Sequence, residues 1–111
     1  MSQTVIDPHV FDELQATAGA DFVVELVDTF AAEAPALLAD MRHAFADGAV
    51  ERFRRAAHTL KSNGSTFGAT RMAEMARTLE LGGPPPNVNG VDALAHEFET
   101  TLAALQRLAR A

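Results

Sequence analysis

Four histidines are the side chains of this sequence best suited to nucleophilic or metal chemistry: His9, His43, His58 and His96. The chain has no cysteine, which excludes disulfides, thiol nucleophiles and cysteine-based metal sites. His9, His43 and His96 have no second histidine four residues away. His96-Glu97 also lacks the second histidine of the metalloprotease helix motif. No metal site is therefore predicted.

His58 differs from the other three in its position on a predicted helix. The apolar stripe of this helix comprises Phe53, Ala57, Leu60 and Gly64. At about 100° per residue, His58 projects roughly 130° away from that stripe, so its ring is expected to reach solvent. Its neighbours on the outer surface, one or two turns away, are basic or small: Arg54, Arg55, Lys61, Ser62 and Ser65.

Charge is unevenly distributed along the chain. Fifteen acidic and nine basic residues give a formal charge of −6. Between Glu51 and Lys61, however, four cations and one anion give +3, which leaves −9 on the other residues. An acidic chain binds the phosphates of nucleic acids poorly, so nucleic acid is not an expected partner. Lys61 is the only lysine, and three residues after His58 its ammonium could meet an oxyanion carried on the imidazole.

An exposed histidine among arginines is often no more than part of a solvated helix face. The small residues that follow, Ser62 to Thr66, favour a functional interpretation. Among them, Gly64 inside a helix costs about 1 kcal/mol relative to alanine and needs a reason. Close approach of another backbone would supply that reason.

The apolar spacing predicts helices almost throughout and no strand, so the fold class is all-α. Asp7 and Pro8 suit the start of a short first helix, which Gly19 ends. From Asp21 to Ala46 the spacing predicts one long helix, with a kink near Ala31 to Pro35. Its expected inner stripe comprises Phe22, Leu26, Phe30, Leu37, Met41 and Phe45.

Three further helices are expected after the Asp47-Gly48 turn. The first covers about residues 49–66, ends near Gly68, and has an inner stripe of Val50, Phe53, Ala57, Leu60, Gly64 and Phe67. The next has a stripe of Met72, Met75, Ala76 and Leu79, and stops at the loop from Gly82 to Gly90. The last begins near Val91, with Leu94, Phe98, Leu102, Leu105 and Leu108 inward. Such helices pack best as an antiparallel four-helix bundle, with the short N-terminal helix capping one end.

The length of 111 residues suits a single domain, residues 1–111. With 48% apolar residues, the chain can bury a real core. No apolar run approaches the roughly 20 residues needed to span a bilayer. Met1 to Asp7 also lacks the basic start and apolar stretch of a signal peptide. We therefore expect a cytoplasmic protein that does not associate with membranes.

The residues around His58 resemble a known family. Ala57-His58-Thr59-Leu60-Lys61-Ser62, followed by Gly68-Ala69 and Leu79-Glu80, is similar to the signature of histidine-containing phosphotransfer (HPt) domains. The resemblance covers nearly the whole chain, because the flanking helices and the Asp47-Gly48 turn also match. Two departures are Ser62, where the family often has glycine, and the long, proline-rich loop from Gly82 to Gly90.

The resemblance implies a carrier in a two-component phosphorelay. His58 would accept a phosphoryl group from an aspartyl phosphate on a receiver domain and pass it to another receiver aspartate. The partners would be receiver domains of response regulators and of hybrid sensor histidine kinases, and the chain itself would be a monomer. Magnesium would belong to the receiver, so this chain needs no cofactor. The sequence has no glycine-rich phosphate cradle, so it is not expected to be a kinase.

The same resemblance, together with the chemistry of the residues, assigns roles to individual side chains. A neutral imidazole is nucleophilic without an activating base. Lys61 would neutralise phosphoryl charge, and Glu80 occupies the position of the family's acceptor that fixes the tautomer of the histidine. Ser62 and Ser65 are candidates for hydrogen bonds to phosphoryl oxygens, and Gly68 for close approach of the next helix near the histidine. Partner docking is assigned to Arg54, Arg55 and Arg77.

Two other functions remain open from the sequence. The chain could be a helical-bundle adapter that binds receivers without being phosphorylated, although such a protein would be expected to have lost the histidine or the lysine. It could also be a structural bundle that dimerises through Met72, Met75 and Leu79. A methionine stripe at helical spacing is more often ordinary core.

Overall fold

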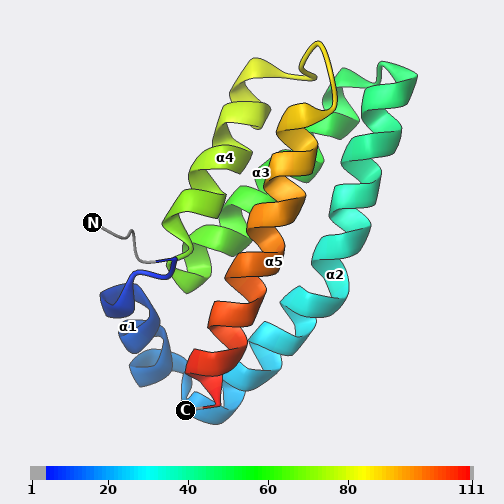
Figure 1. The fold of residues 1–111 in the computed structure, drawn as a ribbon. Helices are drawn as coiled ribbons and strands as arrows, with labels where there is room; N and C mark the ends of the chain where they lie inside the picture. Colours follow the sequence, from blue (N-terminus) through cyan, green and yellow to red (C-terminus); the bar gives the residue numbers. More distant parts are fainter. Residues whose placement is uncertain (1–4, 111) are drawn as a thin grey trace.

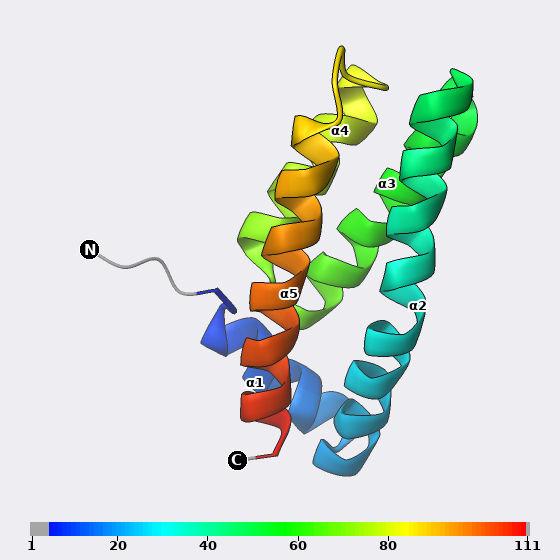
Figure 2. The same ribbon diagram turned by 45° about the vertical axis from the view of Figure 1, so that its right-hand side comes forward.

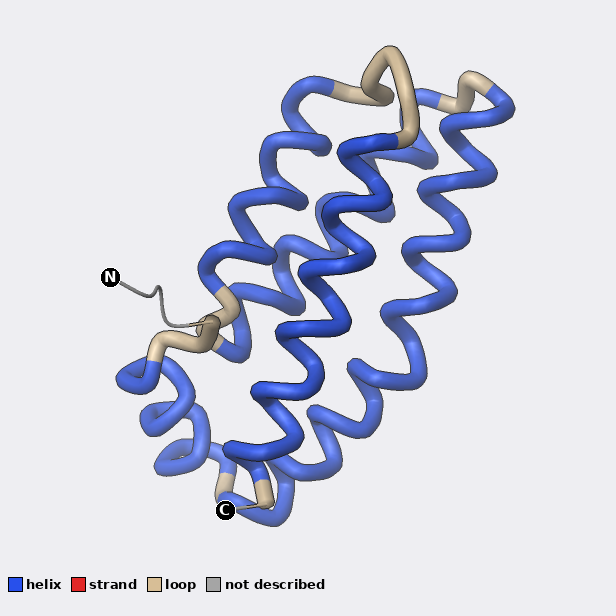
Figure 3. The backbone as a smooth tube through the Cα atoms, in the orientation of Figure 1, coloured by secondary structure: helices blue, strands red, loops and turns tan. Residues whose placement is uncertain are grey.

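The computed structural model describes residues 5–110, so part of the N-terminal segment, residues 1–4, and residue 111 lie outside the described residues. Five helices are present: α1 (Pro8–Ala18), α2 (Ala20–Asp47), α3 (Val50–Phe67), α4 (Thr70–Gly82) and α5 (Asn89–Ala109). In Figure 3 the rest of the described chain consists of short loops, and residues 5–110 contain no strand. The predicted fold class, all-α, is confirmed.

The helices α2 to α5 form an antiparallel bundle. Successive helices run in opposite directions, and the links from α2 to α3 and from α4 to α5 lie at the same end (Figure 1). The short α1 lies at the opposite end, where α2 begins and α5 ends, in both Figure 1 and Figure 2. The predicted four-helix packing with a short N-terminal helix at one end is confirmed.

The start of α1 is fixed by local capping and by a contact with the bundle. The Asp7 side chain accepts a hydrogen bond from the backbone N–H of His9, and Pro8 occupies the first turn. The backbone N–H of Asp7 donates to the carbonyl of Gly68, 2.8 Å away. With Phe11 buried as well, α1 is joined to the end of α3.

The long helix α2 continues through Pro35 without a break. Proline offers no N–H to the carbonyl of Ala31, and Figure 1 shows the axis of α2 bending in its cyan part. The buried residues of α2 are Val23, Val27, Phe30, Ala34, Leu38, Met41 and Ala44. Thus the predicted stripe is correct at Phe30 and Met41 but wrong at Phe22, which is 50% exposed.

The remaining predicted members of that stripe, Leu26, Leu37 and Phe45, are only partly buried. The prediction followed the largest side chains, whereas the buried positions beside them are Val23, Val27, Leu38 and Ala44, so the inward face is rotated slightly and includes alanines. Small residues there let the neighbouring helices pack close to α2. Similar corrections apply to three residues at helix ends or edges: Val50 and Leu108 are exposed, and Leu102 is partly buried.

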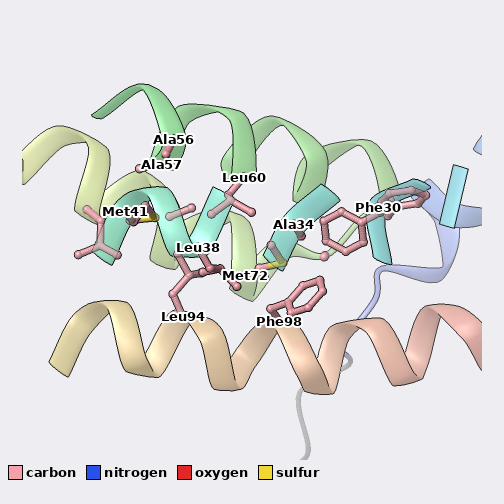
Figure 4. Close-up of a cluster of buried hydrophobic side chains, with 14 of the residues drawn as sticks. Phe30, Ala34, Leu38, Met41, Ala56, Ala57, Leu60, Met72, Leu94 and Phe98 are labelled. Carbon is pink, nitrogen blue, oxygen red and sulfur yellow. The ribbon is translucent and has the colours of Figure 1, made fainter. Parts of the chain in front are cut away.

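The core is a continuous cluster contributed by all five helices, part of which is drawn in Figure 4. Three of its phenylalanines join α2, α3 and α5. The ring of Phe30 lies 5.4 Å from that of Phe67 and 5.2 Å from that of Phe98, centroid to centroid. Such tilted and edge-on pairs add to the stabilisation from apolar burial. Met72 is fully buried and Met75 partly so, as expected of ordinary core residues.

The loop between α4 and α5 is shorter than predicted, because α5 begins at Asn89 and includes Gly90. The side chain of Asn87 accepts a hydrogen bond from the backbone N–H of Asn89 and helps to start the helix. A Cβ on Gly90 would come within 3.1 Å of Leu79, so the start of α5 packs closely on the end of α4. Within residues 5–110, no helix is both long and apolar enough to cross a membrane.

Candidate functional site

His58 lies in the middle of α3 with its side chain 56% exposed. Its chain neighbours Ala56, Ala57 and Leu60 are buried in the core, so the helix holds the backbone of His58 rigidly while the ring faces solvent. The structure therefore has the His58 ring facing solvent, as the position of His58 on the helix predicts. A ring held in this way is accessible to another macromolecule without any opening of the bundle.

The close contact between α3 and α4 determines what lies beside the ring. A Cβ built on Gly64 would meet the backbone N of Ala73 at 3.3 Å, so the two helices approach each other closely at this pair. Because the helices are antiparallel, a residue some positions before Gly64 lies beside the residue about as many positions after Ala73. His58 is six residues before Gly64, and Glu80 is seven residues after Ala73, which brings these two side chains together.

Glu80 holds one nitrogen of the His58 ring. Its Oε2 lies 2.7 Å from Nδ1 of His58. A carboxylate has no proton to donate, so in this contact Nδ1 carries the hydrogen and donates to Oε2. The lone pair of the neutral ring is then on Nε2, the nitrogen farther from the backbone. The geometry thus leaves Nε2 as the nucleophilic atom.

Lys61 contacts the other oxygen of the same carboxylate. Its Nζ lies 2.9 Å from Oε1 of Glu80, and the two side chains are 28% and 21% exposed. Oε1 itself is shielded from solvent. Glu80 therefore bridges the histidine and the lysine, one oxygen to each.

These contacts change the acidity of Glu80. The contact with Lys61 is the largest effect and lowers the pKa of the Glu80 carboxyl below its ordinary value of 4.5. The hydrogen bond with His58 lowers this pKa further, while burial acts in the opposite direction. Glu80 is thus ionised at neutral pH, accepts the hydrogen bond from His58 and forms an ion pair with Lys61.

A shallow depression of about 480 Å³ lies beside the His58 ring, lined by Glu51, Arg54, Arg55, His58, Glu80 and Leu81. It contains two of the three arginines that the sequence assigned to docking. Arg54 also packs against the loop between α4 and α5, since a Cβ on Gly83 would meet the guanidinium nitrogen Nη2 of Arg54 at 3.3 Å. Sequence reasoning missed Leu81, which is 64% exposed. The signal was available, because Leu79 and Leu81 are two residues apart and cannot both face the core of one helix.

The other predicted site residues do not line this depression. Ser62 and Ser65 are exposed one and two turns beyond His58 on α3. Arg77 is exposed on α4. Among residues 5–110, no group of three or more histidines, cysteines or acidic residues is arranged to hold a metal ion.

Gly68 has a different role from the predicted one. It ends α3 with φ +78°, and a Cβ there would come within 2.8 Å of Val10 in α1. The close approach of α4 occurs instead at Gly64. Gly68 therefore serves the end of α3 and the docking of α1, and it does not bring α4 close to the histidine.

Residues 25–110 match the sequence model of the Hpt domain family. The chain belongs to the Hpt domain family. The fold of this Hpt domain is similar to that in the crystal structure of histidine-containing phosphotransfer protein B (HptB) from Pseudomonas aeruginosa PAO1. The match has a TM-score of 0.75 and 26% sequence identity, and covers 98% of this chain and 94% of that one. No curated protein sequence matches the chain significantly.

Membership of the family establishes the general activity. Hpt domains are phosphotransfer proteins of phosphorelays, and they carry a phosphoryl group without being kinases. They interact in general with receiver domains. The chain is accordingly a helical-bundle phosphoryl carrier.

Proposed function

We propose that this Hpt domain carries its phosphoryl group on Nε2 of His58, accepting it from the aspartyl phosphate of one receiver domain and passing it to the aspartate of another. The observation that carries the proposal is the contact of 2.7 Å between Nδ1 of His58 and Glu80 on a side chain that is 56% exposed. It fixes the tautomer and leaves the nucleophilic nitrogen on the solvent side.

The transfer step balances without another reactant. The lone pair on Nε2 attacks phosphorus, the P–Nε2 bond forms, and the P–O bond breaks, so its electrons leave with the receiver carboxylate. The ring keeps its proton on Nδ1 and becomes positively charged, and Glu80 stabilises that charge through the hydrogen bond already present. The reverse sequence delivers the group to the next aspartate. Magnesium is expected on the receiver, so no cofactor is assigned to this chain.

Positioning and charge neutralisation provide most of the catalysis in phosphoryl transfer. Lys61, held beside the ring by Glu80, is the nearest candidate to neutralise phosphoryl charge. Arg54 and Arg55 border the depression next to His58 and suit an acidic surface on a receiver. The exposed Leu81 gives the same surface an apolar contact.

We propose that residues 1–111 form one Hpt domain. The helix α1 precedes residues 25–110, which match the family. It is nevertheless included in the domain, because its Phe11 is buried and the backbone N–H of Asp7 donates to the carbonyl of Gly68. The expected partners are receiver domains of response regulators and of hybrid sensor histidine kinases, bound by a monomer.

The rival function that the sequence suggested is a receiver-binding adapter that is never phosphorylated. It gives no reason for a carboxylate that links the histidine to the only lysine of the chain, and this contact favours the carrier.

The test is to incubate the protein with a phosphorylated receiver and look for a label that is labile in acid and stable in base. His58→Gln should take up no label, while His96→Gln, at an exposed position on α5, should be labelled like the wild type. Label on the His58→Gln variant would refute the assignment. A wild-type chain that binds the receiver and takes no label would favour the adapter.

A further inference from the structure

The same carboxylate contacts both groups that the proposed transfer uses. Oε2 of Glu80 is 2.7 Å from Nδ1 of His58, and Oε1 is 2.9 Å from Nζ of Lys61. Before phosphorylation, therefore, the ammonium of Lys61 is directed to Glu80. If Lys61 also neutralises a phosphoryl group on Nε2, its ammonium is shared between two anions, so its contact with Glu80 weakens as the phosphoryl contact forms.

The contact between Lys61 and Glu80 differs from an ordinary surface ion pair. Both side chains are mostly buried, at 28% and 21% exposed, and Oε1 is shielded from solvent. By comparison, the pair of Arg54 and Glu51 is longer, at 3.9 Å, and its carboxylate is 81% exposed. An anionic oxygen removed from water depends on its partner, so losing Lys61 is costly for Glu80.

We infer that Glu80 and the phosphoryl group on His58 compete for the ammonium of Lys61, and that this competition limits how strongly the carrier holds its phosphoryl group. The inference rests on the proposed function of His58 and adds a regulatory role for Glu80 beyond fixing the tautomer. Its consequence is that Lys61 stabilises the phosphoryl group less than a lysine without an acidic partner would.

The charges explain why the lysine can change partners during the reaction. When P–Nε2 forms, the ring gains a positive charge next to Oε2 of Glu80, and the phosphoryl group brings negative charge to the opposite side of the ring. The carboxylate then has a second cation beside it and depends less on Lys61. Loss of the phosphoryl group reverses both changes, and the lysine returns to Glu80.

The competition predicts that the two residues are not independent. In wild type, Lys61 is partly occupied by Glu80, so Lys61→Ala should slow transfer from a phosphorylated receiver by about tenfold. In a Glu80→Gln background the lysine has no carboxylate to hold it and serves the phosphoryl group fully. In that background, Lys61→Ala should slow transfer by about fiftyfold. The slowing is then about five times larger than in wild type, which is the coupling between the two residues.

The experiment measures transfer rates for the wild type, both single variants and the double variant, with the receiver held constant. Helicity and thermal unfolding of each variant check that the bundle is intact. Arg42→Ala is the matched control, because Arg42 forms its ion pair with Asp92 between α2 and α5. It should change the rate by the same factor with Glu80 or with Gln at position 80.

Equal factors for Lys61→Ala in the two backgrounds, within about twofold, would overturn the competition. A smaller slowing by Lys61→Ala with Gln at position 80 than with Glu80 would also overturn it, because Glu80 would then assist the lysine. Labelling with the small donor phosphoramidate separates the two proposals. Wild type that accepts no label from this donor or from a receiver overturns the carrier function itself, whereas labelled wild type with equal factors overturns the competition alone.

Discussion

At the scale of single residues, His58 combines an exposed ring with a fixed orientation. The ring is 56% exposed, and its Nδ1 is held by a carboxylate that is only 21% exposed. A freely rotating surface histidine would present either nitrogen to a partner. Here one hydrogen bond leaves the lone pair on Nε2 and limits rotation of the ring, which in the proposed transfer reduces the ordering required when a receiver binds.

Lys61 carries the first prediction at this scale. Lys61→Ala should slow transfer by about tenfold, because a positive charge near the phosphoryl oxygens is lost in the transition state. Stopped transfer reactions with a phosphorylated receiver measure the rate. Lys61→Arg, which keeps the charge, is the control and should retain most of the activity. Equal rates for Lys61→Ala and wild type would contradict this role.

Glu80 carries a prediction about pH. The contact with Lys61 lowers the pKa of Glu80 in the folded chain below 4.5, so the ionised carboxylate favours the folded state. This stabilisation is fully present above the ordinary pKa and is lost as the pH falls through the lowered pKa. Glu80→Gln should therefore lower the melting temperature at pH 7 and have little effect in strong acid.

Thermal unfolding of wild type and Glu80→Gln across that pH range measures the difference. Because Lys61 is the largest cause of the shift, the difference at pH 7 should be smaller in a Lys61→Ala background. A difference in melting temperature that stays constant from pH 7 into acid would show that Glu80 does not act through its charge.

At the scale of helices, the pair of Gly64 and Ala73 brings α3 and α4 close enough for Glu80 to reach His58. Gly64→Leu should push the helices apart and destabilise the protein by about 1–3 kcal/mol, because the added atoms have no space beside Ala73. Urea unfolding measures this loss. Gly82→Ala is the control, since a Cβ at Gly82 meets nothing within 4 Å and stability should not fall. Equal stability of Gly64→Leu and wild type would contradict the tight crossing.

At the scale of the whole molecule, the exposed face of α3 is the surface that a receiver must approach to reach His58. Ser65→Trp should abolish or strongly slow transfer, because Ser65 is exposed two turns from His58 and an indole there would obstruct the partner. The fold should lose only about half a kcal/mol, as is usual for an exposed substitution.

The matched control is Ala103→Trp, which places the same side chain at an exposed position on α5. It should transfer at the wild-type rate. Phosphoramidate, which is small, should still label Ser65→Trp, because the chemistry of His58 is untouched. Transfer from the receiver at the normal rate by folded Ser65→Trp would mean that partners approach from another direction.

The amino-acid sequence by itself determined the helices, their order and the exposure of His58. Capping by Asp7 and the left-handed turns at Gly48 and Gly68 are local properties, so they could be predicted from neighbouring residues. The exposure of His58 followed from the rotation of a helix by a fixed angle per residue. Glu80 was assigned by family resemblance, because nothing local links it to a histidine on another helix.

The tertiary structure decided which side chains meet. It brought Nζ of Lys61 into contact with Glu80 and made Leu81 part of the depression beside His58. It also packed Gly68 against α1 instead of α4. It also rotated the inward face of α2 slightly from the predicted stripe, so that Val23 is buried and Phe22 is exposed. Each of these outcomes depends on how far one helix is shifted along and rotated against its neighbour. That relation is set by packing between residues distant in the chain, so the periodicity of a single helix does not contain it.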